Sequence, residues 1–136
     1  MTMMLFVALA TASTPWDYSH FRLTRMTERQ ITSAEYQRCA GKSLSNEQAV
    51  QCIQGELNHL DKTLNAEYRA AVSRMANQHS RQWLRNAQRQ WLKDKDEQCD
   101  EEVRDAGPTP FNMVWHQCTI DEVVRRIAWL RRLSRT

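Results

Sequence analysis

Apolar residues recur at helical intervals through the middle of the chain. They follow one another in steps of three or four residues, as Ile53, Leu57, Leu60, Leu64, Tyr68, Ala71 and Met75. This spacing is typical of the buried stripe of one amphipathic helix. Ser45, with Gln48 three residues later, has the form of a capping box, which marks a helix start. We therefore expect a helix over residues 46–77.

The same pattern predicts three further helices. Residues 77–80 interrupt the first stripe, and we expect Ser80 to be the N-cap of the next helix. That helix is predicted to stop before Gly107 and Pro108, and its apolar positions are Leu84, Ala87, Trp91, Cys99 and Val103. Another begins within 111–119 and carries Ile120, Val123, Val124, Ile127 and Leu130. A shorter helix around 33–40 precedes them all.

The elements define an all-α fold. We expect a small helical bundle with a long antiparallel helix pair as its spine and shorter, disulfide-stapled helices at the ends. Only three Gly and three Pro occur among 136 residues. So few turn residues exclude a turn-rich barrel or sandwich, and the scattered glycines exclude a glycine-rich phosphate loop.

The first residues have the pattern of an export signal. An apolar run over residues 3–10 ends in Ala10-Thr11-Ala12, although no Lys or Arg precedes the run. We expect residues 1–12 to be a signal peptide, 13–32 an N-terminal extension and 33–136 the helical domain. The alternative is a frayed N-terminus of a cytosolic protein. Export, to the periplasm or beyond the cell, agrees better with the four cysteines.

Four cysteines allow three disulfide pairings. Pairing Cys39 with Cys52 centres a hairpin on residues 45–46, and pairing Cys99 with Cys118 centres one on 107–110. Each pair then faces its partner across a turn, where Cα atoms approach the roughly 5.5–6 Å that a disulfide needs. A metal or redox site is disfavoured, because no Cys-x-x-Cys occurs and the four histidines are dispersed.

Folding the chain back near residue 78 predicts a polar seam between the two long helices. Asp61 would lie near Lys95, Asn65 near Trp91, and Tyr68 near Gln88, with Arg89 beside them. Such a seam either fixes the register of two helices or contacts a ligand.

Charge is distributed unevenly along a chain whose net charge is +3. Residues 94–105 hold seven acids against Lys95 and Arg104, a local balance of −5. This patch comprises Asp94, Asp96, Glu97, Asp100, Glu101, Glu102 and Asp105. It is either a solvated face or a patch that steers a basic protein partner. The last helix is basic instead, with Arg125, Arg126, Arg131, Arg132 and Arg135 around Trp129.

Several of these segments carry a family resemblance. The spacings Asp61-x-x-Leu64-Asn65-x-x-Tyr68, Leu84-Arg85-x-Ala87-Gln88-Arg89-x-Trp91-Leu92 and Asp96-x-x-Cys99, then Cys118 and a helix with Arg125 or Arg126, are similar to the LprI-like lysozyme-inhibitor family. The resemblance covers residues 39–133. The chain departs from the family at Asp94 and Lys95, where an aromatic residue and an arginine are usual. The resemblance implies an exported helical protein, and some relatives inhibit lysozyme.

A binding function is therefore expected rather than an enzyme. No histidine stands at a suggestive spacing from a nucleophile, and no cofactor, metal or nucleic-acid partner is indicated. The primary hypothesis is an exported inhibitor that blocks lysozyme, or another peptidoglycan-cleaving enzyme, by covering its cleft. Two alternatives stay open. One is an immunity protein against a periplasm-acting bacterial toxin. The other is an envelope structural or stress protein whose basic last helix makes a weak membrane contact.

Overall fold

The computed structural model describes residues 25–133, and its regular elements there are all helical. This confirms the predicted all-α class. The helices are α1 (Arg25–Ile31), α2 (Ala34–Ala40), α3 (Asn46–Arg74), α4 (Gln78–Ala106) and α5 (Met113–Leu133), with a 3₁₀ turn, η1, at Pro110–Asn112. The expected signal peptide, most of the expected extension and Arg135 lie outside the described residues.

Local capping sets where the helices begin. Ser45 and Gln48 form the predicted capping box of α3, and Ser33 caps α2 by accepting a hydrogen bond from the Tyr36 amide. The prediction that Ser80 caps α4 is wrong. Asn77 is the N-cap, and its Oδ1 accepts a hydrogen bond from the Ser80 amide at 2.9 Å. Because the backbone of Asn77 is extended, its short amide side chain reaches the third helical amide.

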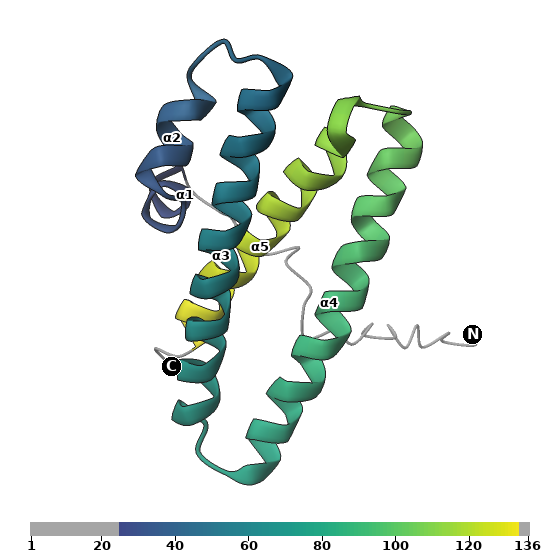
Figure 1. The fold of residues 1–136 in the computed structure, drawn as a ribbon. Coiled ribbons are helices and arrows are strands. Elements are labelled where there is room, and N and C mark those ends of the chain that lie inside the picture. The colour runs from purple at the N-terminus through teal and green to yellow at the C-terminus, as the bar shows by residue number, and fades with distance from the viewer. Residues whose placement is uncertain (1–24, 134–136) are drawn as a thin grey trace, which may run out of the picture.

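The two long helices run antiparallel, but α5 lies between them (Figure 1). α3 and α4 meet at the turn over residues 75–77 and diverge from there, and both pack mainly against α5. The expected spine is therefore a helix pair filled by a third helix. The buried stripes converge on this three-helix core, whose most enclosed apolar side chains are Leu60, Leu84, Trp91, Ile120, Ile127 and Leu130.

α1 is a helix that the pattern did not reveal. It lies in the segment expected to be an extension, and Ile31 at its end is 2% exposed and part of the core. The carboxylate of Glu56 on α3 is buried below the junction between α1 and α2. It accepts hydrogen bonds from the amide of Ser33, at 3.1 Å, and from the Ser33 hydroxyl. This contact anchors the two short helices to α3.

Both predicted disulfides are present. Cys39–Cys52 joins α2 to the start of α3 with a Cα–Cα distance of 6.3 Å, and Cys99–Cys118 joins the end of α4 to α5 at 5.6 Å. The start of α3 and the end of α4 lie at the same end of the molecule, opposite the turn between these helices (Figure 1). Both disulfides therefore lie at the same end of the bundle. The expected arrangement, with one at each end, is not seen.

Candidate functional site

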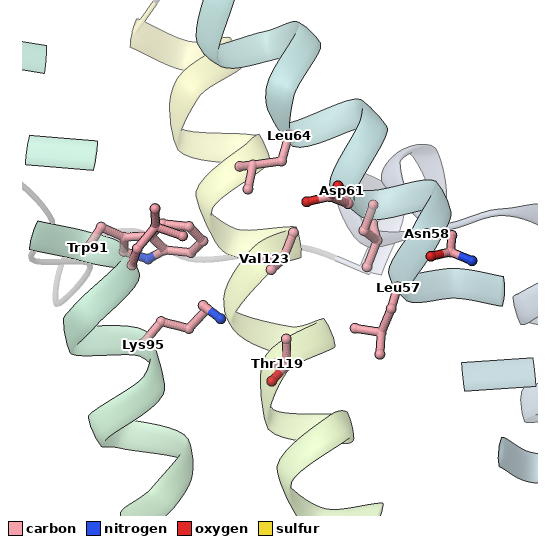
Figure 2. Close-up of a pocket in the computed structure, with 10 residues that line it drawn as sticks. Leu57, Asn58, Asp61, Leu64, Trp91, Lys95, Thr119 and Val123 are labelled. Carbon is pink, nitrogen blue, oxygen red and sulfur yellow. The ribbon is translucent and has the colours of Figure 1, made fainter. Parts of the chain in front are cut away.

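A cleft of about 300 Å³ opens between α3 and α4, with α5 as its floor (Figure 2). The helix stripes supply apolar side chains to it, and polar groups enter from both walls. The lining residues are Leu57, Asn58, Leu60, Asp61, Leu64, Trp91, Leu92, Lys95, Thr119 and Val123. The cleft is thus a mixed apolar and polar depression produced by the divergence of the two long helices.

The structure brings Asp61 and Lys95 to opposite walls of this cleft (Figure 2). They do not form an ion pair with each other. Lys95 Nζ lies 2.9 Å from Asp96 Oδ1 and 5.7 Å from the centre of the Trp115 ring. Asp61 is exposed and makes no hydrogen bond or ion pair within the described part of the chain. The reason is geometric, because α5 holds the two walls apart.

The rest of the predicted polar seam is divided in the same way. Gln88 and Trp91 are buried, Tyr68 is half-buried against the core, and Asn65 and Arg89 are exposed. The expected direct seam between α3 and α4 is therefore wrong as a set of contacts. Gln88 instead binds Arg126 of α5. The intervening helix supplies the partner that the sequence placed on α3.

Arg126 is the polar centre that the sequence analysis missed. Its side chain is 0% exposed and its Nε donates to Gln88 Oε1 at 2.9 Å. Its guanidinium lies 4.2 Å from the centre of the Trp129 ring and 5.3 Å from that of Trp91. A signal was present, because Arg126 stands three residues after Val123 and four before Leu130 on the buried stripe of α5.

This burial divides the basic cluster of the last helix. Arg131 Nε is 2.8 Å from Glu67 Oε1 on α3, and Arg125 lies 3.8 Å from Glu122. Trp129 is partly buried and packs against the core. Arg126 and Arg131 therefore hold α5 against α4 and α3, whereas Arg125 pairs within α5 itself. No described helix is long and apolar enough to cross a membrane.

The predicted acidic patch is displayed on the second half of α4. Asp96, Glu97, Asp100, Glu101, Glu102 and Asp105 are all exposed, whereas Asp94 is half-buried and accepts from Gln90. Glu97, Glu101 and Asp105 are spaced four residues apart, so they form a row along one face of the helix. Asp100 accepts a hydrogen bond from Trp115 Nε1 at 3.2 Å, which connects the patch to α5.

Two acids of α5 have raised pKa values. Burial is the main cause that raises the pKa of Asp121 above its usual value, and the hydrogen bond from Gln117 opposes the rise. Burial likewise raises the pKa of Glu122, against the opposing charge of Arg125. Within residues 25–133, no group of three or more acids, cysteines or histidines is arranged to hold a metal ion.

The turn that joins α4 to α5 has a distinct conformation. Gly107 has φ 77°, a left-handed value that suits glycine, and it is the C-cap of α4. Phe111 and Asn112 also have left-handed φ values, 53° and 56°. For phenylalanine this costs about 1–2 kcal/mol. The Phe111 side chain is nevertheless 54% exposed. We call residues 107–112 the apex.

Together these features define an all-α domain stapled by two disulfides, with an acidic face, a shallow cleft and an aromatic apex. The chain matches the family model described as "Lysozyme inhibitor LprI" over residues 27–130, and it belongs to this family. No curated protein and no solved structure matches the chain. The description of the family favours a protein partner, such as lysozyme, over catalysis.

Proposed function

We propose that this protein acts outside the cytoplasm and inhibits lysozyme, or another peptidoglycan-cleaving enzyme, by covering its cleft. Family membership supports the inhibitory function. The two disulfides support the compartment, because such bonds persist in the periplasm and outside the cell and are rare in the cytosol. Inhibition by covering needs a complementary surface and no reacting group.

The acidic patch of α4 is the observation that carries the proposal. Like charges four residues apart on a helix destabilise it, and acids in the last turns oppose the helix dipole. Each effect amounts to a few tenths of a kcal/mol. A row of Glu97, Glu101 and Asp105 therefore costs stability, and these exposed acids form no hydrogen bond or ion pair within the described chain. A basic enzyme surface would offset this cost and would be steered toward the patch.

Inhibition assays with the oxidised, purified protein test this function. We expect it to stop cell-wall hydrolysis by at least one member of a panel of basic lysozymes at micromolar concentration. Inhibition should weaken as salt is raised, because salt screens charges on exposed surfaces. If no member of the panel is inhibited at micromolar protein, the proposed function is wrong.

A matched pair of variants tests whether the acidic patch of α4 is the surface that contacts the enzyme. The triple variant Glu97→Gln, Glu101→Gln, Asp105→Asn removes three charges from the patch. The control Glu28→Gln, Glu35→Gln, Glu47→Gln removes three exposed charges from α1, α2 and α3. We expect the first variant to slow association at least tenfold and the control to change it little. If both variants slow association equally, the net charge of the protein sets the association rate and the position of the acids does not.

A further inference from the structure

The α4–α5 turn forms part of one end of the molecule. α4 and α5 converge there and the apex caps them, at the end opposite the α3–α4 turn (Figure 1). Glycan-cleaving enzymes bind an extended sugar chain in a concave cleft. The smooth side of a helix fits such a cleft poorly, whereas a narrow turn between two helices can enter it.

Phe111 stands at this turn in a conformation that favours another residue. Its left-handed φ of 53° suits glycine or asparagine, and its ring is 54% exposed to water. Both features oppose folding stability, and strained backbone positions gather at ligand-binding sites. The turn that carries Phe111 lies against α3 and α5, yet more than half of this residue stays exposed. A partner that buries the ring would account for a phenylalanine here.

The apex is also held in shape before any partner arrives. The Asn112 amide donates to the Thr109 carbonyl at 3.3 Å, and the Val114 amide donates to the Thr109 hydroxyl at 3.4 Å. Below the apex, Cys99 and Cys118 are both buried and join the two helices. A loop fixed in this way loses little conformational entropy when it binds.

Charge indicates which kind of cleft the apex fits. The sequence from Ala106 to Ile120 contains no Asp, Glu, Lys or Arg, whereas the acidic patch lies directly before it on α4. Most glycoside hydrolases carry two catalytic carboxyl groups inside the cleft. A neutral apex avoids repulsion from those groups. The acidic patch behind it would meet a basic surface outside the cleft.

We propose that the apex, with Phe111 at its centre, inserts into the active-site cleft of a basic glycoside hydrolase and occupies sugar-binding space there. This inference rests on the proposed function and specifies which part of the protein blocks the enzyme. Phe111 is the aromatic anchor of the contact, and the acidic patch meets the rim of the cleft. Inhibition is then competitive with the glycan.

The test compares Phe111→Asn with Trp83→Ala. Asparagine removes the ring and tolerates the left-handed backbone, so the variant is expected to fold at least as stably as the wild type. Trp83 is a large side chain, 41% exposed, near the opposite end of α4. We expect Phe111→Asn to raise the inhibition constant for a susceptible lysozyme by roughly 30-fold or more, and Trp83→Ala to leave it unchanged.

A cross-linking measurement supplies a second readout. A photoreactive phenylalanine analogue at position 111 should cross-link to the lysozyme, and a chitin oligosaccharide that fills the cleft should suppress the cross-link. If the wild type inhibits but Phe111→Asn inhibits equally well, or inhibition is not competitive, the apex is not the blocking element and the proposed function still stands. If the wild type inhibits no enzyme of the panel, both proposals are wrong.

Discussion

Arg126 of α5 and Gln88 of α4 form a hydrogen bond of 2.9 Å in the interior of the bundle, with the Arg126 side chain wholly removed from solvent. The guanidinium is further enclosed by the rings of Trp91 and Trp129. A buried cation of this kind depends on every partner, because desolvation penalises any group left uncompensated. This pair fixes how α5 sits against α4.

The first prediction concerns this pair. Gln88→Leu should lower the free energy of unfolding by about 1.5–3 kcal/mol, since it removes a hydrogen bond to a charged group. Arg126→Met also destabilises, because it leaves the Gln88 amide buried without that partner. The double variant should cost less than the sum of the two, as measured by urea denaturation in a double-mutant cycle. Additive losses would show that the two side chains do not act together.

The second prediction concerns the two disulfides. Cys99 and Cys118 are 0% and 3% exposed, whereas Cys39 and Cys52 are half-buried. Reductant should therefore open Cys39–Cys52 first, because thiol exchange needs access to sulfur. Alkylation after brief reduction, followed by mass spectrometry, identifies the pair that opens. Labelling of Cys99 and Cys118 first would contradict the accessibility argument.

The third prediction separates the effects of the same two bonds on inhibition. In the chain-entropy model, each disulfide stabilises the protein by roughly 3 kcal/mol through the loop that it closes. Cys39→Ala with Cys52→Ala, and Cys99→Ala with Cys118→Ala, should each lower the free energy of unfolding by about that amount. Only the second pair underlies the apex. We therefore expect the Cys99 and Cys118 variant alone to lose inhibition at a temperature where both variants are folded.

The fourth prediction concerns pH. Burial raises the pKa of Glu122 in the folded protein above its usual value of 4.5. Between the unfolded and the folded pKa the native state binds more protons, so this residue makes stability fall as pH rises through that window. Glu122→Gln removes that contribution. Relative to the wild type, the variant should gain stability from pH 3.5 to pH 7.

Denaturant titrations of both proteins at each pH check this expectation. Asp121 carries a raised pKa as well, so a smaller fall with pH should persist in the variant. A stability difference that stays constant across the range would mean that Glu122 has the same pKa in the folded and unfolded states.

The fifth prediction concerns the anchor of the short helices. Ser33 caps α2 and donates to the buried Glu56 carboxylate. Ser33→Ala should cost about 2 kcal/mol, because it removes both the cap and a hydrogen bond to a charged group. Hydrogen exchange should accelerate in α1 and α2 more than in α4. A uniform change across the chain would show that the anchor is not local.

Local and periodic features of this protein could be derived from sequence. The stripe of α3, its capping box, the end of α4 before Gly107 and both disulfides depend on neighbours in the chain or on symmetry about a turn. The start of α4 shows the limit of that reasoning. Asn77 and Ser80 are both good caps, and the backbone conformation selects Asn77.

The acidic patch could be derived from the sequence more fully than the apex. The seven acids are visible in the sequence, and six of them are exposed because α5 leaves that side of α4 uncovered. Phe111 reads as one more apolar residue after a proline. Only the structure shows that its φ is left-handed and that the residue is exposed to water. The proposed anchor could therefore not have been selected from the sequence.

The sequence by itself determined that this chain forms helices, where most of them stop, and which sulfur atoms meet, because these depend on periodicity, capping and short loops. Only the tertiary structure decided that α5 fills the space between α3 and α4. That placement separates Asp61 from Lys95 and buries Arg126 beside Gln88. The physical reason is that side chains far apart in sequence acquire partners only when packing fixes which helix lies against which.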